Sequence, residues 1–213
     1  MVIAIDGPAG AGKSTVARGV ARALGFTYLD SGAMYRCVGL AALDRRMDLD
    51  DGERLGEMAW DLAIGFEGDT VQLDGKSVEG KIRTPEVTIA SSKVSVHPQV
   101  RQAMVKRQRE LIAAGNYVAE GRDIGTVVSP DSPLKVFLTA SEEERARRRA
   151  AETGEPVEQV KEAIEDRDRR DSSRAHGALR AADDSVEVDT TDLSPGEVVE
   201  RVASLAREKG VAR

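Results

Sequence analysis

The chain has 213 residues, of which 40% are hydrophobic and 32% charged, and its formal net charge is −6. These values are typical of one sizeable globular α/β domain, and the negative charge argues against nucleic acid as a partner. No apolar run approaches the ~20 residues of a membrane span, so we expect no membrane partner. The single cysteine, Cys37, excludes a disulfide framework and suits a reducing compartment. We expect Cys37 to fill space on a helix.

The start of the chain bears on location. The first strand begins at once and leaves no room for a signal peptide, so we expect a cytoplasmic protein. We also expect a monomer.

Arginine accounts for 23 of the 31 basic residues. The planar guanidinium binds oxyanions in pairs, so this bias suits a site that handles several phosphates.

A glycine-rich loop follows the first predicted strand, Val2–Asp6. It has the pattern G-x-x-x-x-G-K-S, in which backbone N–H groups surround a nucleotide β-phosphate and the lysine reaches the β- and γ-phosphates. The serine hydroxyl is placed to bind Mg²⁺, and the next helix adds its positive N-terminal end. The alternative is a glycine-rich turn without chemistry. The predicted ATP-phosphate residues are Gly7, Pro8, Ala9, Gly10, Ala11, Gly12, Lys13, Ser14 and Thr15.

The next elements are a helix over Lys13–Leu24 that ends near Gly25, a strand over Phe26–Asp30 and a helix over Gly32–Arg46. Ligands of an open parallel sheet bind at the carboxyl ends of its strands. We therefore expect Arg36, shortly after the second strand, to lie beside the glycine-rich loop and to meet a phosphate.

Residues 64–82 break this alternation of strands and helices. Apolar and polar residues alternate around two turn sequences, Glu67-Gly68-Asp69 and Asp74-Gly75-Lys76, which predicts a small antiparallel sheet. Helix starts follow at Thr84-Pro85 and His97-Pro98. We predict an inserted lobe over residues 64–96 within a core made of 1–63 and 97–213. Such a lobe is either a substrate-binding attachment or a structural decoration.

Three further strands are predicted at Tyr117–Glu120, Leu134–Thr139 and Ser185–Asp189. Most of the five strands are apolar throughout, as strands buried on both faces of a parallel sheet are. The predicted fold is therefore α/β, a doubly wound five-stranded parallel sheet of the P-loop type. Ser141-x-x-Glu144 and Ser194-Pro195-x-Glu197 read as capping boxes, and the last helix ends at Gly210.

Charged residues gather at two later places. Glu120-Gly121-Arg122-Asp123 ends the third strand, where Glu120 matches the acidic residue that organises Mg²⁺ in many P-loop proteins, through water. Arg167, Asp171 and Arg174 have helical spacing that places them on one face. Alone, such a face is usually solvated. Behind a P-loop, it predicts a helical lid over residues 145–175 that closes on the migrating phosphoryl group and excludes water.

Several classes of P-loop protein remain open at this point. They are a kinase of a small molecule, a regulatory GTPase or ATPase switch, and a nucleotide-binding module without turnover. The chain lacks the Asn-Lys-x-Asp segment that reads guanine, and it is too short for an ATPase that drives a second machine. These observations favour a small-molecule kinase.

Six motifs, in order, resemble the bacterial cytidylate kinase family. They are GPAGAGKST, DSGAMYR, IRTPEV leading to SSKVS, VRQAMVKRQRE, AEGRDIGTVV and DRDRRDSSRA. The resemblance runs from the first strand to the last helix and implies ATP-dependent phosphorylation of CMP and dCMP, with Mg²⁺. It implies that the lobe is a CMP-binding lobe. A P-loop kinase of another acceptor, such as UMP, AMP or a metabolite, stays the alternative.

The resemblance also implies roles for individual residues, with no departure at the matched positions. Ser92, Arg101 and Asp123 match residues that read cytosine. Arg36 and Arg122 match residues that hold the CMP phosphate, with Ser31 alongside. Arg167 and Asp171 match sugar contacts, and Arg174 matches a lid arginine that faces phosphate. Lys13, Arg36, Arg122 and Arg174 are the expected catalytic residues.

The base-reading set is chemically reasonable. Cytosine presents an exocyclic amine that a carboxylate such as Asp123 accepts, and two acceptors to which Arg101 donates. Uracil reverses this edge at two positions and would leave buried groups unpaired, which a hydrogen-bonding site rejects strongly. Without the resemblance, Ser92 would be read as an ordinary polar helix residue.

Overall fold

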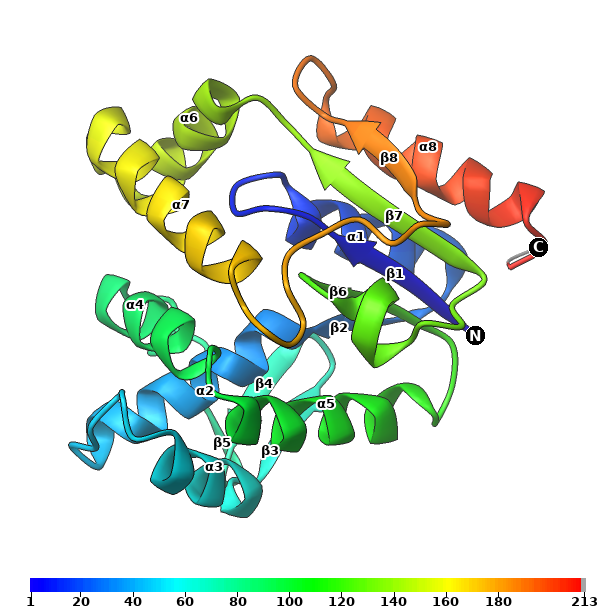
Figure 1. Ribbon diagram of the computed structural model, residues 1–213. Helices are drawn as coiled ribbons and strands as arrows, with labels where there is room; N and C mark the ends of the chain where they lie inside the picture. The colour runs from blue at the N-terminus through cyan, green and yellow to red at the C-terminus, as the bar shows by residue number, and fades with distance from the viewer. Residues whose placement is uncertain (212–213) are drawn as a thin grey trace. The chain divides into compact units, whose positions relative to one another are not determined.

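The computed structural model describes residues 1–211 and contains a five-stranded sheet with the order β2-β6-β1-β7-β8 (Figure 1). β1 pairs in parallel with β6 and β7, and β7 pairs in parallel with β8. The strands are β1 (Val2–Asp6), β2 (Thr27–Asp30), β6 (Tyr117–Gly121), β7 (Leu134–Thr139) and β8 (Val186–Asp189). The predicted doubly wound parallel sheet and its five strands are confirmed.

The chain divides into two compact units, and the sheet belongs to the first. Unit 1 comprises Met1–Leu29 and the segment from Ile112 onward, and unit 2 comprises Asp30–Leu111. None of the helices within residues 1–211 is long and apolar enough to cross a membrane.

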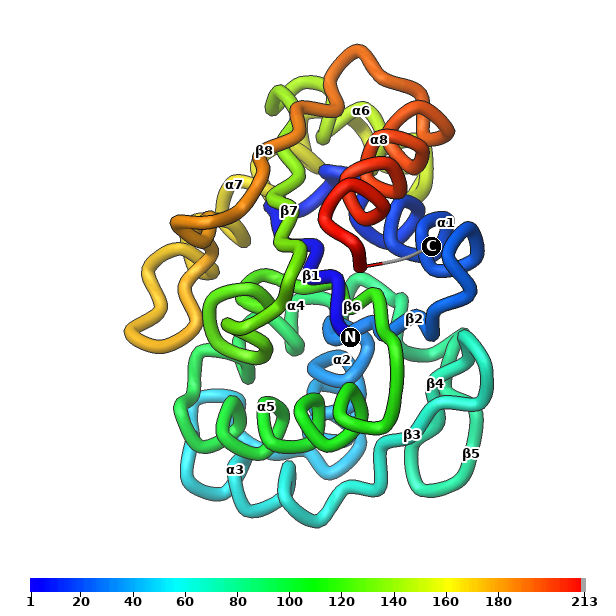
Figure 2. The backbone as a smooth tube through the Cα atoms, turned by 90° about the vertical axis from the view of Figure 1, so that its right-hand side faces the viewer, coloured from blue at the N-terminus to red at the C-terminus, as the bar shows by residue number. Residues whose placement is uncertain are grey.

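The helices of unit 1 cover the sheet and extend from its carboxyl edge. α1 and α8 pack on each other on one side of the strands (Figure 2), and α6 packs on α7 beyond the end of β7 (Figure 1). Their bounds are α1 (Lys13–Leu24), α6 (Glu142–Thr153), α7 (Val157–Ser172) and α8 (Pro195–Glu208), and a short π-helical turn, η1 (Ile124–Val128), follows β6.

Side chains from the sheet, α1 and α8 form the core of unit 1. Ile3, Ile5, Val118, Val136 and Leu138 from the strands are almost fully buried. They pack with valines and alanines that recur at helical spacing on the inner faces of the two helices. Burial on both faces explains why these strands are apolar throughout rather than alternating.

The helix ends follow their predicted signals with one exception. α1 ends at Gly25, whose φ of 67° suits glycine, and α8 begins with a complete capping box between Ser194 and Glu197. The capping box predicted at α6 is wrong in its second half. Ser141 accepts from the Glu144 N–H, but the Glu144 carboxylate pairs with arginines one turn further along the helix.

Unit 2 combines four helices with a three-stranded antiparallel sheet. The predicted hairpins are confirmed, with turns at Gly68 and Gly75. The elements are α2 (Ser31–Asp44), α3 (Gly52–Asp61), β3 (Ile64–Glu67), β4 (Thr70–Leu73), β5 (Lys76–Ser77), α4 (Pro85–Val94) and α5 (Pro98–Ile112). The predicted lobe, residues 64–96, lies wholly within unit 2, and its boundaries stay a prediction.

Three features of unit 2 concern the helices. α2 and α4 approach so closely that a Cβ on Gly39 would lie 2.8 Å from the Ser91 nitrogen, so glycine is needed there. Cys37 is a buried free cysteine on α2, as predicted. We did not predict α3, which is short and follows an acidic stretch. Asp51 caps its first turn by accepting from the Arg54 N–H.

Candidate functional site

The glycine-rich loop connects the carboxyl end of β1 to α1. Gly7, Gly10 and Gly12 have φ values of 151°, 77° and 83°, which side-chain-bearing residues rarely adopt. A Cβ on Gly7 would lie 2.2 Å from the Leu138 carbonyl oxygen, and one on Gly10 would lie 2.8 Å from the Arg145 carbonyl oxygen. The loop therefore needs glycine both for its conformation and for its close packing against β7 and α6.

Lys13 lies at the start of α1 with its side chain buried. Its Nζ donates to the Pro8 carbonyl oxygen at 2.6 Å, across the loop. Burial and the charge of Arg122 lower the pKa of Lys13 to about 7. An anion on the loop would counter both effects, because its charge would stabilise the protonated amine. Ser14 and Thr15 are exposed at the first turn of α1, where backbone N–H groups remain available to an anion.

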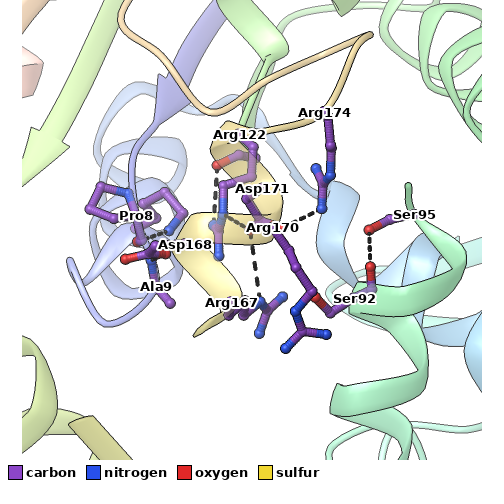
Figure 3. A network of polar contacts seen from close by, with 12 residues as sticks. Pro8, Ala9, Ser92, Ser95, Arg122, Arg167, Asp168, Arg170, Asp171 and Arg174 are labelled. Carbon is purple, nitrogen blue, oxygen red and sulfur yellow. Dashed lines mark hydrogen bonds and ion pairs between the residues drawn. The ribbon is translucent and has the colours of Figure 1, made fainter. Parts of the chain in front are cut away.

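Three arginines converge on one buried carboxylate, that of Asp171 (Figure 3). Arg122 Nε donates to Asp171 Oδ2 at 2.8 Å, and Arg167 Nε lies 3.9 Å from the same oxygen. Arg174 donates to the other oxygen, Oδ1. Burial alone would raise the pKa of Asp171, but the three guanidinium charges outweigh it and the pKa is lowered. Asp171 therefore stays ionised and holds the three arginines together, and two of them, Arg122 and Arg167, lower the pKa of the P-loop lysine.

The helical spacing of this set needs one correction. α7 ends at Ser172 and Ser173 caps it, so Arg174 lies just beyond the helix. Arg174 still reaches Asp171, three residues earlier, because the chain continues in a helical conformation at the cap. The prediction of one shared helical face is right for Arg167 and Asp171 and wrong in detail for Arg174.

Asp6, which the sequence analysis did not single out, fixes the loop after β6. Its two carboxylate oxygens accept from the Ile124 and Gly125 N–H groups at 2.8 and 2.7 Å. Burial raises the pKa of Asp6 to about 6 despite these two bonds. Asp6 thus ties the strand that carries the P-loop to the turn that directly follows Arg122 and Asp123. A signal was present in the sequence, since an acidic residue ends an otherwise apolar strand.

Glu120, the predicted Mg²⁺-organising residue, is buried near the end of β6. Its Oε1 accepts a hydrogen bond from the Tyr28 hydroxyl, which orients the carboxylate. Residues 1–211 hold no cluster of three acidic, His or Cys side chains that could bind a metal by themselves. One hydroxyl on Ser14 and one carboxylate nearby suit Mg²⁺ that arrives with nucleotide phosphates and keeps several waters.

Unit 2 holds two of the residues predicted to bind the phosphate of CMP, Ser31 and Arg36. Asp30 caps α2 by accepting from the Ala33 N–H at 2.7 Å, and its second oxygen accepts from Arg36 at 2.8 Å. The guanidinium of Arg36 therefore lies at the N-terminal end of α2, next to buried Ser31. An arginine and a helix N-terminus together favour an anion.

The predicted base-reading residues of unit 2 are buried. Ser92 lies on α4, and its hydroxyl has no hydrogen-bond partner within residues 1–211. Its carbonyl oxygen accepts from the Ser95 hydroxyl at 2.9 Å (Figure 3). Arg101, on α5, stacks over the ring of Tyr35 of α2 at 5.6 Å. Buried hydroxyls are normally hydrogen-bonded, so Ser92 has capacity for a ligand.

The predicted site residues thus divide between the two units. Unit 1 brings together the loop at residues 7–15 with four charged residues. They are paired with one another, and Arg122 and Arg167 interact electrostatically with the loop's lysine; the four are Arg122, Arg167, Asp171 and Arg174. Asp123 is also in unit 1, buried at the start of η1. Ser31, Arg36, Ser92 and Arg101 belong to unit 2.

A P-loop after the first strand of a doubly wound sheet, with an arginine cluster from the end of β6 and from α7 beside it, defines the class of P-loop phosphotransferases. Solved structures of similar fold include a gluconokinase from Sinorhizobium meliloti, 17% identical with a TM-score of 0.53 over 99% of this chain and 94% of that one. Another is TT1252 from Thermus thermophilus, 24% identical with a TM-score of 0.50 over 98% and 97%. At these identities the likeness concerns the fold.

The family is shown by the sequence comparisons. The family model described as cytidylate kinase matches residues 3–208. A cytidylate kinase of Caldanaerobacter subterraneus is 49% identical over 97% of this chain and 94% of that protein. One of Bacillus cereus is 48% identical over 95% and 94%. The chain belongs to the cytidylate kinase family, which confirms the resemblance.

Proposed function

We propose that this protein transfers the γ-phosphoryl group of ATP to CMP and dCMP, giving ADP with CDP or dCDP. The observation that carries the proposal is the family match over residues 3–208, combined with a P-loop whose lysine has arginines for neighbours. The relatives just described carry the name cytidylate kinase. None of the observations favours a GTPase switch, a module without turnover or a kinase of another acceptor.

The donor side would be built by the P-loop. Backbone N–H groups of the loop at residues 7–15 would surround the ATP phosphates, except at Pro8, which has none, and Ala9, whose N–H donates to Asp168. Lys13 would exchange the Pro8 carbonyl for phosphate oxygens. Mg²⁺, held by ATP, the Ser14 hydroxyl and Glu120 through water, would neutralise charge on the phosphates. The chain's own task is to position the phosphates and keep their charge compensated.

The acceptor-binding residues are those that the family resemblance implies. Arg36 and Arg122, with Ser31, would hold the CMP phosphate, and Arg167 and Asp171 would contact the sugar. Ser92, Arg101 and Asp123 would read the cytosine edge. Two phosphates that approach each other repel strongly, and arginines on both would lower that repulsion.

The reaction itself would be a direct in-line transfer. An oxygen of the CMP phosphate attacks the γ-phosphorus, the bond to the β–γ bridging oxygen breaks, and ADP leaves. The CMP phosphate is already ionised and nucleophilic, so no covalent enzyme intermediate is needed. Residues 145–175 would act as the lid that excludes water, and Arg174 would stabilise the migrating group. The CMP-binding lobe, the monomeric state and the cytoplasmic location stay predictions.

The test is an assay of ADP release with CMP, dCMP, UMP, AMP and shikimate as acceptors, with a reaction that lacks an acceptor as control. We expect CMP and dCMP to be used far better than the other three, and ATP to be hydrolysed only slowly without an acceptor. Preferred use of AMP, UMP or shikimate would contradict the proposal. Hydrolysis that no acceptor accelerates would indicate an ATPase.

A further inference from the structure

The backbone of one P-loop residue, Ala9, is held by the two helices that follow β7. The Ala9 N–H donates to Asp168 Oδ1 of α7 at 3.0 Å (Figure 3), and the Ala9 carbonyl oxygen accepts from Arg145 Nη1 of α6 at 3.0 Å. The same Arg145 nitrogen donates to the second oxygen of Asp168. Ala9, Asp168 and Arg145 therefore form a closed ring of hydrogen bonds, which we call the Ala9 clamp.

Apolar packing reinforces the Ala9 clamp. The methyl group of Ala9 packs against a small cluster of Ala150, Val160 and Ile164, which lies between α6 and α7. The next residue, Gly10, approaches the backbone of Arg145 so closely that even a methyl group there would clash. The P-loop thus forms part of the packing between the two helices, at the level of Ala9 and Gly10.

The charges of the Ala9 clamp are largely removed from water. The side chains of Arg145 and Asp168 are 8% and 15% exposed. By contrast, Arg169 and Asp166 form an ion pair on the surface of α7, and their side chains are 75% and 62% exposed. A buried ion pair needs its remaining hydrogen-bonding groups satisfied, and here the Ala9 peptide satisfies one on each partner. Exposed pairs such as Arg169–Asp166 contribute little.

Asp168 also stands next to proposed functional residues without being one of them. Asp168 follows Arg167 and precedes Asp171 by three positions on α7. If Asp168 moves relative to the P-loop, Arg167 and Asp171 therefore move with it. We propose that Arg145 and Asp168 are positioning residues, which fix α7 to the P-loop at Ala9 so that Arg167 and Asp171 are aligned with the transferring phosphoryl group. This inference rests on the proposed kinase function.

The proposal separates alignment from binding. Neither Arg145 nor Asp168 belongs to the predicted ATP or CMP contacts, and the Ala9 N–H that they hold already donates to Asp168 rather than pointing at a ligand. We therefore expect their loss to change the affinities for both nucleotides little. The arginines of the lid, however, would no longer be aligned with the P-loop. Misplacement by ~1 Å costs about a hundredfold in turnover when reacting groups must be aligned. The expected signature is a fall in kcat that is much larger than any change in nucleotide affinity.

The experiment compares Asp168→Ala, Asp168→Asn and Arg145→Met with the matched control Asp166→Asn, which removes an exposed carboxylate two residues away. We expect kcat to fall about ten- to a hundredfold for Asp168→Ala, with ATP and CMP dissociation constants within about threefold of the wild type. Asp168→Asn keeps an acceptor for the Ala9 N–H and is expected to lose less. Asp166→Asn is expected to behave as the wild type. Hydrogen exchange at the Ala9 amide is expected to accelerate in Asp168→Ala.

A double variant and a thermal scan complete the test. Because both residues act through Ala9, Asp168→Ala combined with Arg145→Met is expected to cost no more in kcat than the worse single variant. If kcat stays within about twofold of the wild type, at a temperature where each variant is folded, the two residues are only structural and the inference is wrong. Multiplied losses would also overturn it. If the wild type fails to phosphorylate CMP, the proposed function fails instead.

Discussion

The two units prepare their predicted site residues in different ways. In unit 1 these residues are charged and paired, since Asp171 collects three arginines and Lys13 is held across the P-loop. In unit 2 the predicted base-reading residues are buried, and the Ser92 hydroxyl has no hydrogen-bond partner within residues 1–211.

This difference suggests a division of labour. Charge networks hold cations at fixed places in advance, so the site needs no reorganisation when a phosphoryl group is transferred. Buried hydrogen-bonding groups that await a ligand discriminate between bases, because the wrong base leaves them unpaired. Changes at the charged phosphate-handling side chains of unit 1 should therefore affect turnover for any base. Changes at base-reading positions, including Asp123 of unit 1, should affect the choice of base.

The largest effect is expected from Lys13→Ala. We expect kcat to fall by about a thousandfold or more, because the charge on the migrating phosphoryl group is no longer compensated. The fold should persist, since the lysine contacts its own loop rather than the core. Steady-state kinetics and circular dichroism check both parts. Turnover near that of the wild type would show that the loop does not hold the donor phosphates.

Arg174→Ala is expected to lower kcat by about ten- to a hundredfold, with a smaller effect on CMP binding in the absence of ATP. The reason is that a lid arginine stabilises the transferring group more than the ground state. Turnover assays and calorimetric titration with CMP separate the two effects. A change confined to the KM for CMP would make Arg174 a simple substrate-binding residue.

Asp123→Asn is expected to lower the ratio of kcat/KM for CMP over UMP by at least about tenfold. The carboxylate accepts only, whereas an amide can turn and donate to uracil O4, so CMP loses a charge-assisted bond and UMP loses less. Assays with both substrates measure the ratio. Equal losses for CMP and UMP would make Asp123 a structural carboxylate.

Asp6→Asn is expected to change how stability depends on pH. Burial raises the pKa of Asp6 from 3.8 to about 6, so the folded protein binds this proton more tightly than the unfolded chain does. The associated stability is complete below the unfolded pKa and is lost as pH rises through about 6. Between about pH 4.5 and about pH 6.5, the wild type should therefore lose about 1–2 kcal/mol relative to Asp6→Asn. Denaturant unfolding at several pH values measures this difference. If the free energies of unfolding of the two proteins change with pH in parallel, the prediction is wrong.

Ser92→Ala is expected to have the smallest effect. The kcat/KM for CMP should fall about threefold to tenfold, the value of one neutral hydrogen bond. The free energy of unfolding should hardly change, because the hydroxyl has no partner within residues 1–211. A large loss of stability with unchanged kinetics would assign Ser92 to the fold rather than to the site.

The sequence predicts the parts of the fold and of the candidate site that depend on a local pattern of residues. Apolar runs located all five strands, and the glycines of the P-loop located the turn between β1 and α1. The spacing of Arg167 and Asp171 predicted that they share a face of α7. The spacing did not reveal that the helix ends before Arg174, because the cap residue Ser173 keeps a helical conformation and the helical spacing continues past the end.

Contacts between distant segments were not predictable in the same way. Asp6 and the turn at Ile124 are 118 residues apart, and Ala9 and Asp168 are 159 residues apart. Nothing in the local sequence distinguishes Asp168 from the exposed Asp166 on the same helix. The carboxylate of Glu144 was likewise assigned to a cap, but arginines compete for it. Such choices are made by tertiary packing.

The most direct test of the division of labour is the ratio of kcat/KM for CMP over UMP in the wild type, Arg174→Ala and Asp123→Asn, measured under one set of conditions. We predict that Arg174→Ala lowers both values and leaves the ratio within about twofold of the wild type, because the arginine acts on the phosphoryl group. We predict that Asp123→Asn lowers the ratio at least about tenfold. A ratio that falls in Arg174→Ala but not in Asp123→Asn would contradict the account.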